Sequence, residues 1–363
     1  MRMCTTVSTR DLQTAAFGAS MTTAVAQTPL AEVEAAVRQH YGFHTAVASR
    51  LHSERDELFL IDASAGVKYV LRFANPADDR SVIDMQARAL EWIANADPAL
   101  PVPRLIPRLQ GGTQWLFAEG ATAQRLVRLS SYLEGRPLAG APRSVQQRRA
   151  IGTLLARLGR ALRDFSHPGA DHVLAWDIQH ASSLRELVPS ADITASAQRW
   201  DLVRGGLDRF ERVVKPRMPE LRAQVVHADF NPHNLLVDPA DPDIISGILD
   251  FGDMVRTPLV NDVAIAACYH AGSEYPLADV ADVVSAYHAV TPLLRREIEL
   301  LYDLIVTRLC AAVAITEWRA RRYPHNRDYI LKNTSIAWTA LERLSAVEPS
   351  AAAAILYQAC HVE

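Results

Sequence analysis

The chain changes character at Glu134-Gly135-Arg136-Pro137, and this change limits the possible folds more than any other feature. Before it, short segments alternate apolar and polar residues, which predicts strands, and after it apolar residues recur at helical spacing. The stretch Gln224–Asp253 is the one β-rich piece of the second half. The pattern therefore predicts an α+β fold with two lobes: a small lobe with an antiparallel sheet at 28–133 and a large helical lobe at 134–363.

The individual elements follow from periodicity, capping residues and turn residues. A length of 363 residues also favours two lobes over one compact core. The expected small-lobe elements are a helix Leu30–Tyr41, strands Leu58–Asp62 and Lys68–Phe73, a helix from Asp78 or Asp79 to Ala96, and two further strands, the last Arg125–Leu133. The expected large-lobe helices are 145–165, 195–217, 262–270, 276–289, 293–321, 326–345 and 350–360.

Composition argues against several classes of protein. A formal net charge of -3 at pH 7 gives no reason to expect nucleic acid or an acidic membrane as a partner. No run of about 18 apolar residues occurs, so no membrane span is expected. The polar N-terminus lacks the apolar stretch of a signal peptide, and residues 1–27 are expected to be a disordered tail, or an over-long start ahead of Met21. The four cysteines lie far apart, which favours a reducing, cytoplasmic setting.

Two motifs in the β-rich piece indicate the chemistry. The first is His227-Ala228-Asp229 with Asn234 five residues after the aspartate, and the second is Asp250-Phe251-Gly252. This is the H-x-D-x-x-x-x-N and D-F-G spacing with which kinases transfer a γ-phosphoryl group. It predicts a protein-kinase-like fold, with ATP or GTP as co-substrate and Mg²⁺ as the metal.

Each motif residue receives a predicted role. Asp229 is the expected catalytic base, because a strand end presents it to an attacking hydroxyl. Asn234 and Asp250 are the expected Mg²⁺ ligands, since Mg²⁺ prefers oxygen donors. The alternative is that all three are ordinary turn residues. Two motifs in register, each after an apolar β-branched run, favour the catalytic interpretation.

Three neighbouring residues are expected to support the site. His227 is interpreted as a buried imidazole that braces the loop against Phe251 and moves no proton. Asp262 is either a helix cap or an acceptor of hydrogen bonds from the catalytic loop. Asp253 follows D-F-G at the mouth of the site, where a third metal contact or a substrate ammonium is expected.

The small lobe should supply the nucleotide contacts. Lys68, Val70 and Arg72 share one face of a strand, which predicts Val70 under the base and Arg72 on the α/β-phosphates. Gln86 on the following helix is the expected partner of Arg72. Lys68 lies near the turn and is expected to be solvated.

No P-loop motif occurs, and the place of a Gly-rich loop is taken by Ser53-Glu54-Arg55-Asp56, where Ser53 is the expected donor. Ser131 and Leu133, at the end of the last small-lobe strand, complete the predicted nucleotide site.

These motifs resemble those of the aminoglycoside phosphotransferase/choline kinase superfamily, over about residues 30 to 345. Within it the hydroxylysine kinases are the most similar. The segments that carry this similarity are residues 53–56, 69–72, 127–137, 247–254, 308–310 and 323–329. The resemblance implies a purine nucleoside triphosphate, Mg²⁺ and a small, amine-bearing alcohol as acceptor. The chain departs from the family where Arg72 stands in place of the strand lysine.

For an amino-acid substrate, Arg308 on the helix 293–321 is the expected carboxylate partner, and a structural salt bridge is the alternative. Hydroxylysine is the first predicted substrate, with aminoglycoside, homoserine and choline-type alcohols as alternatives. An inactive kinase-like binding module is disfavoured because Asp229, Asn234 and Asp250 are all present. The sequence favours neither ATP nor GTP and predicts no oligomeric state.

Overall fold

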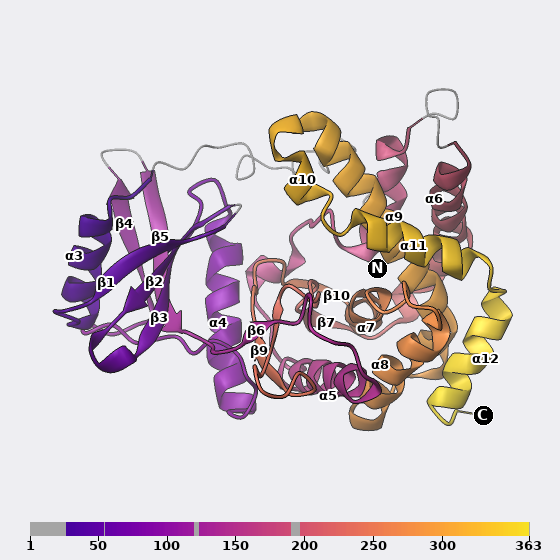
Figure 1. Ribbon diagram of the computed structural model, residues 1–363, viewed down its shortest axis with the longest axis horizontal. Helices are drawn as coiled ribbons and strands as arrows, with labels where there is room; N and C mark the ends of the chain where they lie inside the picture. The colour runs from indigo at the N-terminus through magenta and orange to yellow at the C-terminus, as the bar shows by residue number, and fades with distance from the viewer. Residues whose placement is uncertain (1–26, 54, 120–122, 190–196, 363) are drawn as a thin grey trace.

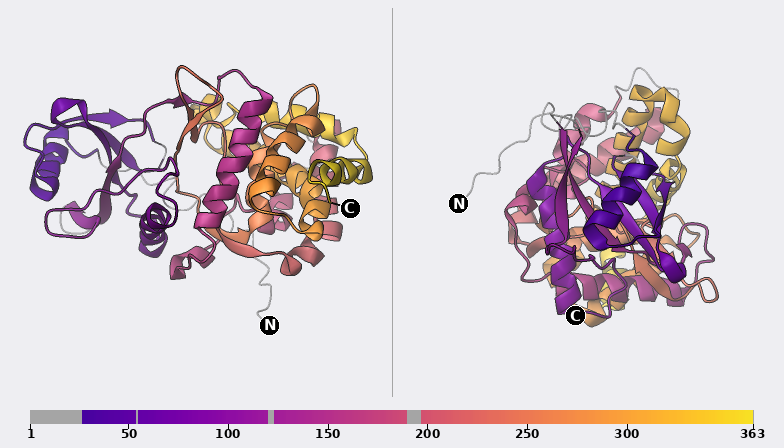
Figure 2. Two further views of the ribbon diagram at one scale, coloured as in Figure 1. Left: turned by 90° about the horizontal axis from the view of Figure 1, so that it is seen from below. Right: turned by 90° about the vertical axis from the view of Figure 1, so that its left-hand side faces the viewer.

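A computed structural model describes residues 27–53, 55–119, 123–189 and 197–362. Apart from Gln27, the tail predicted at 1–27 lies outside these residues. A small lobe with an antiparallel sheet stands beside a larger helical lobe, and two further views show the same division (Figures 1 and 2). The predicted α+β, protein-kinase-like fold is therefore confirmed.

The small lobe is built on one five-stranded antiparallel sheet with the strand order β1-β2-β3-β5-β4. Its strands are β1 (Val47–Leu51), β2 (Glu57–Asp62), β3 (Lys68–Phe73), β4 (Gln114–Glu119) and β5 (Ala123–Ser131). Helix α3 (Leu30–Tyr41) covers the outer face of the sheet, with Val33 and Val37 buried against Phe59 and Leu71. Strand β1 was not predicted, because its one buried residue, Ala48, gives no alternating pattern.

Helix α4 (Arg80–Ala96) connects the two lobes. Asp79 caps it by accepting a hydrogen bond from the backbone N–H of Ser81. Its apolar side chains Met85 and Ile93 belong to the core of the large lobe. The indole N–H of Trp92 donates to the carbonyl of Ala161 in that lobe. The helix that carries Gln86 is thus fixed to the large lobe, between it and the sheet (Figure 1).

The large lobe is mainly helical. Its α-helices are α5 (Val145–Ala161), α6 (Ala197–Arg209), α7 (Leu259–Cys268), α8 (Pro276–Val290), α9 (Arg295–Arg322), α10 (Arg327–Ile330), α11 (Thr334–Ser345) and α12 (Pro349–Ala359). Its strands are β6 (Arg136–Pro137), β7 (Ala223–Val226), β8 (Leu235–Val237), β9 (Ile245–Ile248) and β10 (Val255–Pro258). A Cβ at Gly152 would lie 2.1 Å from the carbonyl oxygen of Val283, so only glycine permits the close approach of α5 to α8.

Two predicted helices differ from the structure. The helix expected at 195–217 continues from α6 into a π turn, Phe210–Val214, and a 3-10 turn, Lys215–Glu220. The helix expected at 326–345 is broken into α10 and α11, and Asn333 stands at the N-cap position of α11. None of the helices that the structure describes combines the length and apolar character needed to cross a bilayer.

Candidate active site

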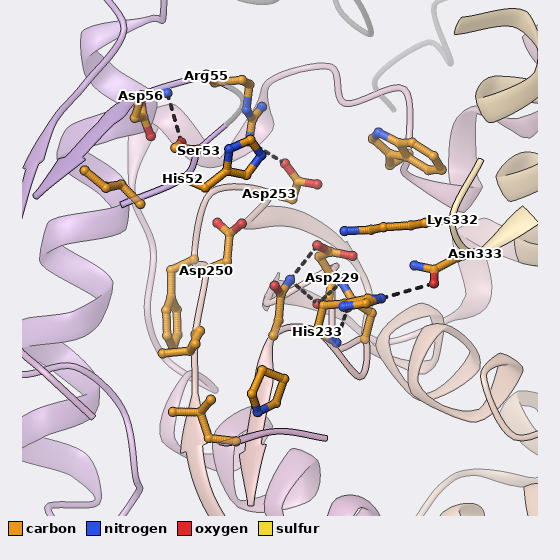
Figure 3. A pocket seen from close by; sticks show the side chains of 18 of the residues that line it. His52, Ser53, Arg55, Asp56, Asp229, His233, Asp250, Asp253, Lys332 and Asn333 are labelled. Carbon is orange, nitrogen blue, oxygen red and sulfur yellow. Dashed lines mark hydrogen bonds and ion pairs between the residues drawn. The ribbon is translucent and has the colours of Figure 1, made fainter. Parts of the chain in front are cut away.

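A pocket of about 730 Å³ is lined by residues of both lobes. The small lobe contributes the β1–β2 connection, Val70 and Arg72 of β3, and Arg128, Ser130 and Ser131 of β5. The large lobe contributes residues of the segments 229–236 and 249–253. Parts of α9 and of the α10–α11 region close the far wall. Figure 3 shows Asp229, Asp250 and Asp253 gathered at its centre.

The loop between β7 and β8 holds the predicted base. The side-chain amide of Asn234 donates to the Asp229 carboxylate at 2.7 Å and to the Asp229 carbonyl at 3.1 Å. Because the amide nitrogen makes both bonds, the amide oxygen of Asn234 is available to a metal ion. Ala228 has a φ of 62°, an unfavourable left-handed backbone conformation that turns the chain directly before Asp229.

Asp250 is the second oxygen donor. It follows β9 with a φ of 54°, and its carboxylate accepts a hydrogen bond from the N–H of Gly252. In the described part of the chain no three His, Cys, Asp or Glu side chains form a metal cluster. Mg²⁺ is usually held by one or two protein ligands together with substrate phosphates, so the pair Asn234 and Asp250 fits this ion.

His227 and Asp262 hold the catalytic loop in shape. The Nδ1 of His227 accepts from the N–H of Asp229, and its Nε2–H donates to the carbonyl of Leu249. The imidazole also packs against the ring of Phe251, at 4.9 Å between centroids, so the predicted bracing contact is present. The Asp262 carboxylate accepts from the backbone N–H groups of residues 227 and 228. The helix-cap alternative for Asp262 is wrong, because α7 begins three residues before it.

The environment of Asp229 favours a base active near neutral pH. Burial and then the charge of Asp253 raise the pKa of Asp229 to about 6, although Arg308 opposes this shift. Proton transfer is most efficient when the pKa of the base lies near the working pH. The carboxylate is thus partly desolvated, with its pKa raised toward neutral pH.

Arg308 reaches the pocket but is already engaged by protein groups. Its guanidinium lies 3.7 Å from the Asp229 carboxylate, donates to the carbonyl of Trp176 and stacks on the Trp176 ring. It also donates a hydrogen bond to the side chain of Tyr269. The predicted structural alternative was a salt bridge to a neighbouring helix, whereas the acidic partner in the structure is Asp229 in the loop after β7. Trp176 was not predicted, because no sequence motif marks it.

Arg72 pairs with Gln86, as expected. The guanidinium donates to Gln86 at 2.9 Å, and it also forms an ion pair with Asp56 at 2.6 Å. The Gln86 amide in turn donates to the carbonyl of Gly252 at 3.1 Å. A buried polar chain therefore connects β3, α4 and the D-F-G turn.

Arg55 is a pocket cation that was not predicted from the sequence. Its guanidinium donates to Asp253 at 3.1 Å, across the two lobes (Figure 3). A Cβ added to Gly252 would lie 2.8 Å from Asp250 Oδ1 and 3.0 Å from Arg55 Nη2, so the glycine allows this close approach. The signal available in the sequence was the adjacent pair of opposite charges, Arg55 and Asp56, directly before the predicted strand Leu58–Asp62.

The remaining predicted nucleotide residues all line the pocket: Val70, Ser53, Ser131 and Leu133. The Ser53 hydroxyl accepts a hydrogen bond from the backbone N–H of Asp56, and the Ser131 hydroxyl accepts one from the backbone N–H of Arg104. Lys68 lies outside the lining, with its ammonium over the Tyr132 ring.

Comparison with known proteins agrees with this geometry. Residues 48–300 match the phosphotransferase enzyme family. Hydroxylysine kinase of Danio rerio is 30% identical over 325 residues, which cover 86% of this chain and 90% of the relative. Among solved structures, a microcompartment-associated aminopropanol kinase has a TM-score of 0.67 at 18% identity, covering 88% of this chain and 98% of that one. An amicoumacin kinase bound to AMP-PNP and Ca²⁺ has a TM-score of 0.65 at 14% identity, covering 89% and 95%. The chain belongs to the phosphotransferase enzyme family and is a small-molecule kinase.

Proposed function

We propose that this kinase transfers the γ-phosphoryl group of ATP or GTP to a hydroxyl of a small amine-bearing metabolite, with hydroxylysine as the first candidate. The observation that carries the proposal is the meeting of Asp229, Asn234 and Asp250 in one interlobe pocket. Similarity to hydroxylysine kinase over most of both chains supports the choice of substrate.

In the proposed mechanism the substrate hydroxyl lies against Asp229 Oδ1, because the amide of Asn234 already occupies Oδ2. The carboxylate accepts the hydroxyl proton as the new O–P bond forms and the bond from the γ-phosphorus to the β,γ-bridging oxygen breaks. Asn234 and Asp250 would hold Mg²⁺, which neutralises phosphate charge when bound. Most of the rate then comes from positioning and charge neutralisation.

The small lobe is assigned to the nucleotide. Val70, Ser131 and Leu133 are proposed to contact the base, and Ser53 the phosphates. Arg72 remains a proposed phosphate ligand, and its ion pair with Asp56 also fixes the β1–β2 connection. Asp253 is proposed to meet the substrate ammonium, since it faces the same space as Asp229 (Figure 3).

A cytoplasmic setting is part of the proposal. Cys268, Cys310 and Cys360 are free buried thiols, as a reducing compartment allows.

The test is a phosphate-transfer screen of the purified chain with MgCl₂ and either ATP or GTP. Hydroxylysine, homoserine, an aminoglycoside and choline are the acceptors, and the phosphate ester is detected by ³¹P NMR. We expect an ester of at least one hydroxylated amine, and none with the Asp250→Ala variant. Nucleotide binding without any ester would contradict the proposal and favour a kinase-like binding module.

A further inference from the structure

We propose that Lys332 forms a carboxylate subsite, through which the enzyme selects hydroxylated amino acids over the amino alcohols that lack a carboxylate. This rests on the function proposed above. Lys332 belongs to the segment 329–334, which runs from the end of α10 to the first residue of α11. The whole segment except Leu331 lines the pocket on its large-lobe side.

The segment is fixed to both the catalytic loop and the small lobe. The Nε2–H of His233 donates to the side-chain oxygen of Asn333 at 3.1 Å, and His233 follows Asp229 by four residues in the same loop. The ring of Tyr329 meets the ring of His52 edge to face, at 5.4 Å between centroids. These contacts give Lys332, which lies between Tyr329 and Asn333, a defined place beside the base.

Lys332 is directed into the pocket. Its side chain extends from this segment toward Asp229 (Figure 3). Its ammonium lies 4.2 Å from the centroid of the Tyr329 ring, a cation–π contact that favours this orientation. Lys68 and Lys215, the other lysines, do not line the pocket.

The ammonium of Lys332 has no ion pair within the residues that the structure describes, whereas Lys215 pairs with Glu211. An ammonium that retains hydrogen-bond donors beside a substrate cavity is suited to an anionic group. The nearby acidic groups, Asp229 and Asp253, are directed toward the reacting hydroxyl and the substrate ammonium in the proposed mechanism. Because Arg72 and Ser53 are proposed to meet the nucleotide phosphates, we assign a substrate carboxylate to Lys332.

Arg308, to which the sequence assigned the carboxylate, is less suited to it. Its side chain is 3% exposed and already contacts Trp176, Tyr269 and Asp229. A carboxylate bound there would share the guanidinium with Asp229, which lies 3.7 Å from it. We therefore assign the carboxylate to Lys332 and treat Arg308 as a positioning residue for Asp229.

The experiment uses three substrate pairs: hydroxylysine, homoserine and threonine, each with the amino alcohol that remains when its carboxylate is removed. Steady-state kinetics compare the wild type with Lys332→Met, Lys332→Arg and the matched control Lys215→Met. We expect Lys332→Met to raise the KM for the preferred amino acid by about 10-fold or more, because a charge-assisted hydrogen bond is lost. The KM values for its amino alcohol and for the nucleotide should change less than about threefold, and Lys332→Arg should recover most of the loss.

Calorimetric binding of the same amino acids does not require turnover, so it separates this inference from the proposed function. If no acceptor is phosphorylated but an amino acid binds and Lys332→Met weakens it, the proposed function fails and the subsite stands. Equal effects on both members of a pair, a raised nucleotide KM, or no binding of any amino acid would overturn the subsite. A carboxylate-selective loss in Arg308→Leu but not in Lys332→Met would also overturn it, in favour of Arg308.

Discussion

Arg55 of the small lobe and Asp253 of the large lobe form an ion pair at 3.1 Å, although they are 198 positions apart in the sequence. The pair stands beside Asp250 in the pocket (Figure 3). Asp253 raises the pKa of Arg55, so the guanidinium stays charged at every working pH. A cation in this place is suited to the terminal phosphate of a nucleoside triphosphate.

The first prediction follows from this position. Arg55→Met is expected to weaken the binding of the triphosphate by about 10-fold and that of the diphosphate by less than about threefold, as measured by calorimetry. Arg72→Met should weaken the binding of both nucleotides, because Arg72 holds Asp56 and Gln86 in place through an ion pair and a hydrogen bond. The exposed Arg88 is the matched control, and its methionine variant should bind both nucleotides normally. Equal losses for both nucleotides in Arg55→Met would contradict the assignment.

The second prediction concerns the base. Asp229→Ala is expected to lower kcat by at least about 100-fold, because general base catalysis contributes a factor of about 10² to 10⁴. Nucleotide-induced thermal stabilisation should persist, since the proposed metal ligands Asn234 and Asp250 remain. Near-normal turnover in this variant would exclude Asp229 as the base.

The third prediction concerns the metal. Asn234→Ala and Asp250→Ala should each reduce the increase in Tm that nucleotide produces in the presence of Mg²⁺. The increase measured with nucleotide and EDTA should be the same in the wild type and in both variants. An undiminished Mg²⁺-dependent increase in both variants would mean that other groups hold the ion.

The fourth prediction concerns stability and pH. Burial of Glu57 alone would favour its neutral form, but hydrogen bonds from Thr28, Arg50 and Arg125 outweigh it and lower the pKa of Glu57. The unfolded state therefore binds the proton more readily, and the stabilisation is complete above the unfolded pKa near 4.5 and lost as the pH falls through the folded value. Glu57→Gln should cost about 3 kcal/mol at neutral pH, because it replaces the carboxylate that pairs with the fully buried Arg125 by a neutral amide.

Urea unfolding at several pH values measures this effect. The difference between wild type and Glu57→Gln should shrink as the pH is lowered below about 4.5. If the difference in the free energy of unfolding stays constant with pH, the loss of stability in Glu57→Gln comes from packing and not from the charge of Glu57. Glu91→Gln, which affects an exposed pair with Arg88, is the control and should change stability by less than about 1 kcal/mol.

The sequence alone determined the two-lobe α+β fold, because strand and helix periodicities are local and change sharply near Gly135. It also determined which residues stand where a base and metal ligands are needed, since Asp229, Asn234 and Asp250 lie within short motifs between neighbouring strands. The pairing of Arg72 with Gln86 followed as well, because strand alternation and helix spacing fix which face each side chain occupies.

Only the tertiary structure decided which charged side chains contact one another across the pocket. Arg55 reaches Asp253, and Arg308 reaches Asp229, through the packing of the lobes and helices, which no local pattern records. The break between α10 and α11 turns Lys332 into the pocket, although its residues have helical spacing in the sequence. Local periodicity specifies the helices and strands, whereas long-range packing decides which charged side chains face one another. In this protein those charged side chains include Lys332 and Asp253, which we propose select the substrate.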